Sequence, residues 1–498
     1  MPTAESDSDQ RLSRRRRLTV LVICSMSLLI VGLDSTIVNV ALPAIHRSLH
    51  SSLAGLQWVI DAYTLVIASL LMLSGSTADR VGRKRVFMIG LIVFTLGSGL
   101  CAAAPNLDLL VAARVLQGIG GSMLNPVAMS IIRNVFDDPR ERAQAIGVWG
   151  AMVGISMALG PVLGGALVVS VGWRFVFLVN LPVGALALIL THAFVPESKA
   201  LAPRRIDPVG QVLVIVGLAA LVYAIIQGHQ DGWTSPEILS LFAIAVVSFV
   251  ALVRHELRRR EPLIEIRFFR SVPFAGASAI AVCAFAALGG FLFINTLYLQ
   301  DVRHLSALDA GLYTLPTAAM MLVFAPVSGR IIGYRSSRGP LLAAGFALLA
   351  SPLLLIGLAP HTSIGLLLAS YLLFGIGSGL VNPPITNTAV SGMPPAQAGV
   401  AAAIASTSRQ VGQTLGIAVI GAVAGAGASA SFGPAFATAT HPSWWIIAGL
   451  GGAVLALGVL STTRWALDTA HATAARLQPE SPSSAPRRRA GPEPAPAA

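Results

Sequence analysis

Long apolar segments follow one another through almost the whole chain, separated by short polar stretches. A segment of about 20 apolar residues spans the hydrocarbon core of a bilayer as a helix. A helix satisfies its own backbone hydrogen bonds in lipid, so these segments predict an all-α polytopic membrane protein. We predict fourteen transmembrane helices, at approximately 18–42, 54–74, 86–104, 107–129, 143–169, 175–195, 208–228, 236–253, 274–299, 308–331, 339–358, 363–385, 397–425 and 443–463.

The distribution of Lys and Arg predicts the orientation of these helices. With the N-terminus in the cytoplasm, cytoplasmic segments carry 29 of the 34 basic residues and external loops carry 3. Basic loops resist translocation, so we expect both termini to be cytoplasmic. The first apolar segment has no small-residue cleavage site after it, so we interpret it as an uncleaved span. Only 2 of the 34 basic residues are Lys, which is typical of a GC-rich bacterial genome and points to a bacterial inner membrane.

Composition and motifs exclude several other classes of function. The net charge of +12 comes from loop arginines without interleaved aromatic residues, so a nucleic-acid partner is not expected. Cys24, Cys101 and Cys283 lie in apolar segments, without the spacing of a metal site or a disulfide framework. The sequence has no P-loop, HExxH or CxxC pattern. We therefore expect no enzyme activity, no metal and no cofactor.

One polar loop, 74–87 (SGSTADRVGRKRVF), carries an ordered pattern of charges and glycines between two apolar segments. Gly75 and Gly82 predict tight turns, because glycine tolerates backbone angles that other residues avoid. Asp79 is placed to accept backbone hydrogen bonds in the turn or to hold an arginine. Arg80 and Arg83 follow within four residues of it.

A few charged residues lie inside the predicted helices. Asp34, Asp61 and Arg114 are predicted at a similar depth, and Gln117 lies one helical turn from Arg114. An intramembrane carboxylate costs several kcal/mol unless it is paired, neutralised or hydrated, so it indicates function by default. A structural polar contact between helices is the alternative. In the second half Arg409 either lines a cavity or pairs with backbone carbonyls.

The segment 154–167 (GISMALGPVLGGAL) concentrates small residues on a predicted fifth helix. Small residues allow close contact between helix backbones in lipid. The residues concerned are Gly154, Gly160, Pro161, Gly164 and Gly165.

An internal repeat relates the two halves of the chain at an offset of 257 residues. This predicts that the fourth and twelfth spans are equivalent, as in two parallel six-helix halves. At the same offset Arg114 becomes Tyr371, so the halves are unequal in charge. The repeated residues are Gly118, Ile119, Gly120, Asn125 and Pro126, which recur as Gly375, Ile376, Gly377, Asn382 and Pro383.

Several of these patterns resemble motifs of major facilitator superfamily transporters. The loop 74–87 resembles the family's signature loop between helices 2 and 3, with Thr77 where that family usually has leucine. The pattern L-x-x-x-R-x-x-Q-G-x-G at 110–120 resembles the motif that supplies a buried arginine near the proton site. The glycine pattern of 154–165 resembles the motif that marks exporters. The segment 172–184 (GWRFVFLVNLPVG) resembles one typical of fourteen-helix drug:proton antiporters.

The resemblance implies a domain organisation of two six-helix bundles, 18–195 and 274–465. A linker at 196–273 would carry two additional transmembrane helices and a cytoplasmic strap. The N-terminal tail 1–17 and the tail 466–498 are expected to be cytoplasmic, and the second is predicted to be disordered from its Ala, Pro, Ser and Arg content.

The resemblance also implies proton-coupled efflux of lipophilic, preferentially cationic drugs or antibiotics. Proton coupling is assigned to Asp34, Arg114 and Asp61, because burial disfavours a charged Asp34 while Arg114 favours it. A dedicated exporter of one natural product is the alternative, followed by a proton-coupled uptake permease. Protons, membrane lipid and a lipophilic substrate are the expected partners of a monomer.

Two further groups of residues are assigned through the resemblance. Substrate-cavity residues would be Asp61, Trp58, Tyr63, Gln117 and Arg409, with the aromatic rings attracting a cation beside Asp61. Conformational gating is assigned to Gly75, Asp79, Arg80, Gly82, Arg83, Gly154, Gly160, Pro161, Gly164 and Gly165.

The charge distribution generates a test of topology. Reporter fusions at residues 10 and 470 should both give a cytoplasmic signal, because 5 basic residues precede the first predicted span and 5 follow the last one. The measurement is the activity of a reporter that functions on one side of the membrane only. An external signal from either fusion would mean that the number of spans is wrong.

Overall fold

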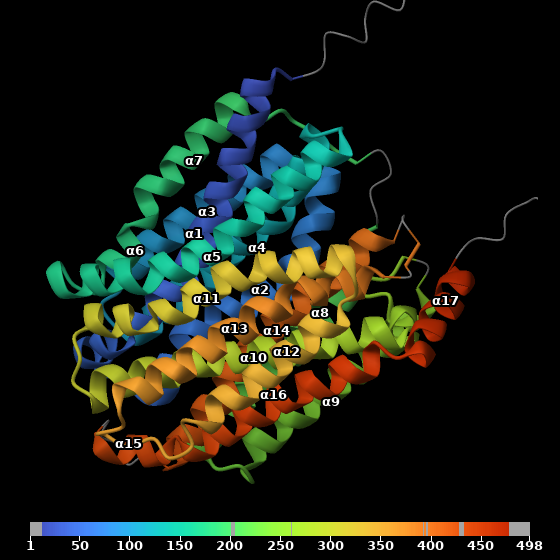
Figure 1. Ribbon diagram of the computed structural model, residues 1–498. Helices are drawn as coiled ribbons and strands as arrows, with labels where there is room; N and C mark the ends of the chain where they lie inside the picture. Colours follow the sequence, from blue (N-terminus) through green and yellow to red (C-terminus); the bar gives the residue numbers. More distant parts are fainter. Residues whose placement is uncertain are drawn as a thin grey trace, which may run out of the picture.

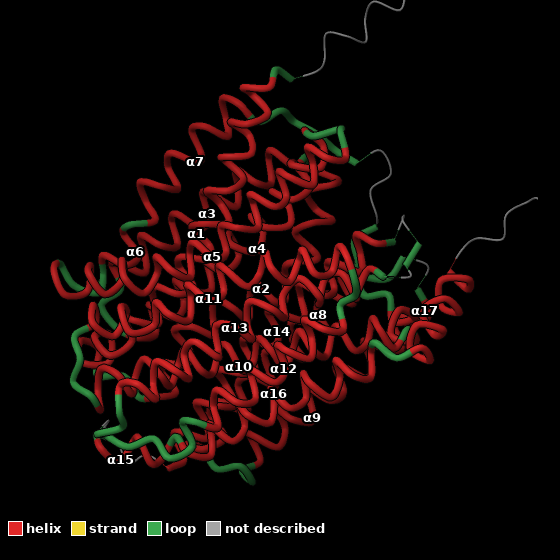
Figure 2. The backbone as a smooth tube through the Cα atoms, in the orientation of Figure 1, coloured by secondary structure: helices red, strands yellow, loops and turns green. Residues whose placement is uncertain are grey.

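The computed structural model describes residues 12–200, 205–259, 261–391, 393–394, 397–427 and 433–477. All regular elements in these ranges are helices, and these ranges contain no strand (Figures 1 and 2). The start of α1 and helix α17 lie toward the same end of the molecule, and α6 and α15 lie toward the other (Figure 1). We call these the termini end and the far end.

The first bundle contains six spans. Helix starts are fixed by side chains that accept backbone N–H groups of the first turn: Ser52 for α2, Asn106 for α4 and Asp138 for α5. The sixth span is broken after one turn. The spans are α1 (Arg14–Leu49), α2 (Leu53–Val81), α3 (Arg83–Ala103), α4 (Leu107–Val135), α5 (Pro139–Ser170) and α6 (Phe175–Leu178) with α7 (Asn180–Phe194).

Two inserted helices follow, α8 (Pro208–Asp231) and α9 (Pro236–Arg258). They pack against each other, and α8 also packs against α2 and α14. Val214, Leu218 and Val222 of α8 share an apolar cluster with Leu65 of α2 and Ala418 of α14. The inserted pair therefore lies along the junction of the two bundles.

The second bundle repeats the arrangement of the first. A short 3₁₀ segment, η1 (Ile266–Arg270), precedes it and α17 (Arg464–Leu477) follows it. Its helices are α10 (Val272–Leu297) with the π-turn η2 (Tyr298–Val302), α11 (Ala307–Tyr334), α12 (Arg338–Leu353), α13 (Ile364–Val390), α14 (Ala398–Gly427) and α16 (His441–Ser461), which the short α15 (Pro434–Ala439) precedes.

The number of spans agrees with the sequence-based prediction. Within the described ranges, 13 helices are long and apolar enough to cross a membrane, and α12 is a shorter apolar helix at the predicted eleventh span. Helix α12 ends at Leu353 and continues as turns through 354–357. The fourteen-helix prediction is therefore confirmed.

The repeated glycines have equivalent neighbours in both bundles. A Cβ on Gly118 of α4 would lie 2.9 Å from the Tyr63 carbonyl of α2, and one on Gly375 of α13 would overlap the Thr317 carbonyl of α11. Glycine is required at both positions because a backbone fills the space of the side chain. The contacts match α2 with α11 and α4 with α13, in agreement with the internal repeat.

Three local predictions are wrong. Helix α2 continues to Val81, so Gly75 and Asp79 are helical and only Gly82, with φ +130°, makes the turn. Helix α1 begins at Arg14, inside the predicted tail, while residues 1–11 lie outside the described ranges. Residues 466–477 belong to α17 rather than to a disordered tail. The rest of that predicted tail, 478–498, also lies outside the described ranges.

The two bundles meet in the middle and at the far end, and they diverge toward the termini end (Figure 1). On the termini half of α5, Val148 is 49% exposed, and a Cβ on Gly147 or Gly150 would meet nothing within 4 Å. Hydrogen bonds and an ion pair join the bundles: Gln57 with the carbonyls of Ile417 and Ala418, Thr414 with Thr64, Gln300 with the Val40 carbonyl, and Arg47 with Asp301 are among those in the described part of the chain.

The glycines of α5 contact two different helices. Gly160 and Gly164 face α1, where a Cβ on Gly164 would lie 2.7 Å from Ile37 Cγ1. Gly165 faces α11 of the second bundle, where a Cβ would lie 2.5 Å from Leu308 Cα. Gly160 and Gly164 thus allow close packing within the first bundle, and Gly165 allows the two bundles to touch at the far end.

This division generates a test with matched glycine variants. Gly165→Leu should hold the bundles apart at the far end, because its side chain needs the space of the α11 backbone. Gly160→Leu should instead lower the thermal stability, since overpacking costs about 1–3 kcal/mol. Distances between spin labels on Ser48 and Leu312, with thermal unfolding in detergent, would separate the two effects. Gly147→Leu is the control, and equal behaviour of all three variants would contradict this assignment.

Candidate functional site

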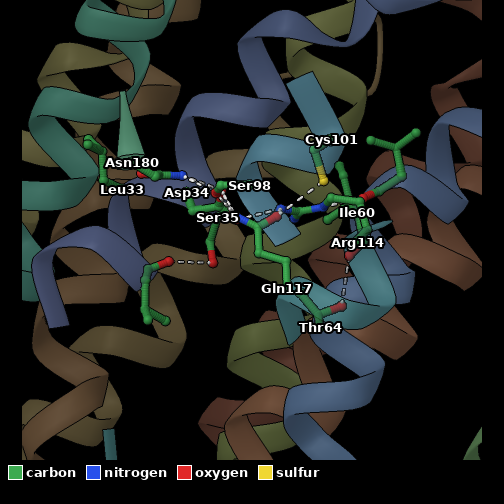
Figure 3. Close-up of polar contacts among 12 residues, drawn as sticks. Leu33, Asp34, Ser35, Ile60, Thr64, Ser98, Cys101, Arg114, Gln117 and Asn180 are labelled. Atoms are coloured by element: carbon green, nitrogen blue, oxygen red, sulfur yellow. Dashed lines mark hydrogen bonds and ion pairs between the residues drawn. The ribbon is translucent and has the colours of Figure 1, made fainter. Parts of the chain in front are cut away.

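A buried ion pair occupies the interior of the first bundle (Figure 3). Asp34 of α1 and Arg114 of α4 are both fully buried, and Arg114 Nη1 lies 2.5 Å from Asp34 Oδ2. The other carboxylate oxygen accepts hydrogen bonds from Gln117 Nε2 at 2.8 Å and Asn180 Nδ2 at 3.0 Å. The predicted proximity of Asp34, Arg114 and Gln117 is confirmed.

Arg114 has several neutral partners besides Asp34. Its Nε donates to the Val59 carbonyl at 2.9 Å, and Nη1 also donates to Gln117 Oε1 at 2.7 Å. The guanidinium lies 4.2 Å from the centre of the Tyr63 ring, within the range of a cation–π contact. Its Nη2 is buried and has no hydrogen-bond partner. The guanidinium can therefore remain partly stabilised when Asp34 is neutral.

Helix α3 adds one hydroxyl, that of Ser98, beside the ion pair (Figure 3). Ser98 Oγ accepts from Gln117 Nε2 at 2.6 Å and from Asn180 Nδ2 at 3.1 Å. This contact requires α3 and α4 to lie close together. Gly97 allows it, because a Cβ there would lie 2.7 Å from the Gln117 backbone. The network thus joins α1, α3, α4 and α7.

Two of these residues, Ser98 and Asn180, are absent from the sequence-based prediction. A signal existed for Asn180, because it lies in the segment 172–184 that carries part of the family resemblance. It begins α7 after the break that separates α6 from α7. The break places its amide beside Asp34 rather than along a continuous helix.

Asp61 lies on another side of α2, toward the second bundle. It is fully buried, its Oδ1 accepts from Thr64 Oγ1 at 3.3 Å, and its Oδ2 has no hydrogen-bond partner. Thr64 in turn accepts from Thr414 of α14 at 2.9 Å. No hydrogen bond or ion pair within the described ranges links Asp61 to Asp34 or Arg114. The two carboxylates therefore occupy separate sites.

Tyr63, one of the two aromatic residues assigned to Asp61, faces a different site. Tyr63 follows Asp61 by two residues, about 200° around the helix, and packs over Arg114. Trp58 packs against Tyr223 of α8, with ring centres 5.7 Å apart. The two rings thus contribute to different surfaces of α2.

The predicted gating loop is held by the segment that follows α7. Asp79 pairs with Arg83, with Oδ1 2.9 Å from Nη2, as expected for an acid that holds an arginine. The Asp79 carbonyl accepts from the Ala200 N–H at 3.0 Å, and the Arg83 N–H donates to the Ser198 carbonyl at 2.9 Å. Arg80 is exposed at the end of α2. The loop therefore connects α2 and α3 to the start of the linker.

Arg409, the other charge inside a span, lies between α10, α13 and α14 of the second bundle. It donates to Ser406 Oγ at 3.3 Å and to Thr386 Oγ1. No acidic residue pairs with it within the described ranges. Those ranges also contain no group of three or more His, Cys, Asp and Glu arranged to hold a metal.

The sequence matches the Major Facilitator Superfamily over residues 24–417. Multidrug resistance protein Stp of Mycobacterium tuberculosis is 39% identical over 420 residues, covering 84% of this chain and 78% of that protein. Methylenomycin A resistance protein of Streptomyces coelicolor is 37% identical over 396 residues, covering 78% and 82%. The tetracenomycin C resistance and export protein of Streptomyces glaucescens is 36% identical over 410 residues, covering 82% and 76%.

Solved structures share the fold at much lower identity. A peptide transporter POT in complex with sulfate has a TM-score of 0.64 at 16% identity, covering 92% of this chain and 95% of that one. An inward-facing bacterial homologue of the lysosomal transporter Spinster has a TM-score of 0.61 at 17% identity, covering 93% and 98%. Together, the paired six-helix bundles and the extent of the sequence match establish that the chain belongs to the major facilitator superfamily.

Proposed function

We propose that the protein exports lipophilic small molecules from a bacterial cell in exchange for protons, with Asp34 as the proton-carrying group. The observation that carries the proposal is the fully buried ion pair of Asp34 and Arg114. Among carboxylates inside spans, Asp34 has a neighbouring cation and amide donors that respond to its charge. An intramembrane acid in such a setting is typical of proton relays.

The contacts of Asp34 suggest how protonation changes the conformation. Protonation removes the charge that holds Arg114, Gln117 and Asn180 around one carboxylate. These groups come from α4 and α7, so the packing of three helices depends on one proton. A proton that binds the two conformations with different affinity shifts the equilibrium between them.

Helix α2 connects this site to the second bundle. Its Val59 carbonyl accepts from Arg114, while Gln57 and Thr64 bond to α14. A shift of Arg114 would therefore act on the same helix that forms the junction. This supports coupling between protonation and the relative position of the bundles.

Export is favoured over uptake by the α5 glycine pattern and by the relatives. Their names describe multidrug resistance, methylenomycin A resistance, and tetracenomycin C resistance and export. The cavity at the bundle junction is lined by both apolar and hydroxyl groups, but at about 20 Å³ it is too small for a drug-sized compound in this conformation, so the lipophilic substrate class rests on the relatives. Its lining includes Thr36, Met157, Leu292, Thr296 and Thr314.

The proposal includes the orientation and organisation expected from the sequence. Both termini would be cytoplasmic, so the structure would be open to the cytoplasm and closed outside. The bundles would be 18–195 and 274–465, in a monomer surrounded by lipid in the inner membrane. The loop around Asp79 and Arg83 would control the cytoplasmic side.

A dedicated exporter of one natural product is the second candidate, because two relatives are named for single antibiotics. A panel of toxic compounds tested in a drug-sensitive host that expresses the protein separates the candidates. Resistance to several unrelated compounds supports multidrug export, and resistance to one supports a dedicated exporter.

Asp34→Asn should abolish proton-coupled export, because a fixed neutral group cannot exchange a proton. It should also reduce stability, since Arg114 would remain buried without its counter-charge, at a cost of about 3–5 kcal/mol. The double variant Asp34→Asn/Arg114→Gln removes both charges and should recover stability without recovering coupling. The measurements are substrate-induced proton release in proteoliposomes and thermal unfolding in detergent.

Asp61→Asn is the matched control, since it changes a buried acid outside the ion pair. We expect this variant to retain proton release. It should weaken the binding of cationic substrates more than the binding of neutral ones. If Asp34→Asn retained coupling while Asp61→Asn lost it, the roles of the two carboxylates would be reversed.

A further inference from the structure

Arg409 is a cation without a counter-charge in the described part of the second bundle. Its Nη1 and Nη2 groups donate hydrogen bonds to two neutral hydroxyls, those of Ser406 on α14 and Thr386 on α13. Its Nε is buried and lacks a hydrogen-bond partner among the described residues. Among the described residues, no backbone carbonyl accepts a hydrogen bond from its side chain. The sequence-based alternative of carbonyl pairing is therefore not realised.

The position of Arg409 on α14 directs it toward α10 and α13 and away from the inserted helices. Gly412 of α14 packs against Val282 of α10, and Thr414 bonds to α2. Val411 and Leu415, on another side of α14, pack against the inserted helices. At about 100° per residue, Arg409 lies between the α10 face and the α2 face, away from α8.

The surroundings of Arg409 are accessible. Arg409, Ser406 and Thr386 are each partly exposed, in contrast with the fully buried Arg114. The ring centre of Phe285 on α10 lies 6.0 Å from the guanidinium. Three helices thus surround a reachable cation with one aromatic ring and two hydroxyls.

The equivalent site of the first bundle shows what is missing here. Arg114 has Asp34 as counter-charge, whereas its repeat equivalent Tyr371 donates to Asn295 Oδ1 at 2.5 Å, a neutral pair. The second bundle therefore needs no arginine to complete a polar pair. Arg409 stands outside that equivalence, and no acidic residue of the described ranges pairs with it.

We propose that Arg409 is a subsite for the carboxylate of an exported lipophilic compound, an assignment that rests on the proposed export function. Guanidinium binds carboxylate through two parallel hydrogen bonds, and Arg409, which is partly exposed, has no acidic partner within the described ranges that would compete for them. Ser406 and Thr386 hold the guanidinium while the site is empty. The preferred substrates would then include lipophilic acids and zwitterions, beyond the cations expected from the sequence.

A pair of rhodamine dyes tests the subsite, one with a free carboxylate and the other its methyl ester. The two share the same cationic ring system and differ only in the group that Arg409 would recognise. Arg409→Gln should weaken binding of the carboxylate dye about tenfold or more, the loss expected for a charge-assisted hydrogen bond. Binding of the ester should be unchanged. Fluorescence polarisation with purified protein in detergent gives both affinities.

Two matched variants complete the design. Arg409→Lys keeps the charge without the planar fork and should give an intermediate affinity for the carboxylate dye. Arg335→Gln removes an exposed arginine at the end of α11 and should change neither affinity. Equal loss of both dyes in Arg409→Gln would indicate a structural role, and no loss of either would exclude the subsite. Wild-type protein that does not prefer the carboxylate dye would also exclude it.

The binding assay separates this proposal from the proposed function. It needs no membrane and no proton gradient, so Arg409-dependent binding can be observed even if proton-coupled export fails. Conversely, Asp34-dependent proton release with the ester dye would support the proposed export function. The carboxylate subsite is decided separately, by the binding of the carboxylate dye.

Discussion

The buried pair of Asp34 and Arg114 is the interaction on which the first bundle depends. Two fully desolvated charges are tolerated only when hydrogen bonds satisfy their remaining groups. Gln117, Asn180 and the Val59 carbonyl provide these bonds, so four helices converge on one carboxylate and one guanidinium. One hydrogen-bonding group of the pair remains unsatisfied, because Arg114 Nη2 has no hydrogen-bond partner among the described residues. A pair in this condition is sensitive to a single proton, since neutralising the acid changes the balance of every bond around it.

Charge is distributed unequally over two bundles with equivalent helices. Repeated glycines bring α4 against α2 and α13 against α11 in the same way. The polar centre is an ion pair in the first bundle and a neutral Tyr371–Asn295 pair in the second. The helix contacts are therefore equivalent in the two bundles, whereas the charges at their polar centres differ. In the proposed function this inequality becomes a division of tasks, in which the first bundle would respond to protons and the second, through Arg409, to the charge of a bound compound.

Sequence reasoning located the charges well and their neighbours less well. Counting helical rise from the span ends placed Asp34 and Arg114 at one level, because charged residues in apolar segments are rare and their depth follows from geometry. Ser98 was missed because a serine in an apolar helix is common, and only the Gly97 contact with α4 gives it a role. Tyr63 was assigned to Asp61 by closeness in sequence, although two residues correspond to opposite sides of a helix. Helix α17 buries Ala466, Ala470 and Thr473, which recur at the spacing of one helix face. This spacing was overlooked because the alanine-rich composition of the segment suggested disorder.

The inserted helices must accommodate any movement of one bundle against the other, since α8 packs on both. Its two contacts differ in kind. Gln211 donates to the Ser69 carbonyl of α2 at 2.7 Å, a directional bond inside the membrane. Toward α14 the contacts are apolar, through Ala418, Val411 and Leu415. Apolar contacts are non-directional and allow packed helices to slide, whereas a buried hydrogen bond is costly to break. The inserted pair should therefore move with the first bundle and slide over α14, which keeps that side of the junction covered while the bundles change position.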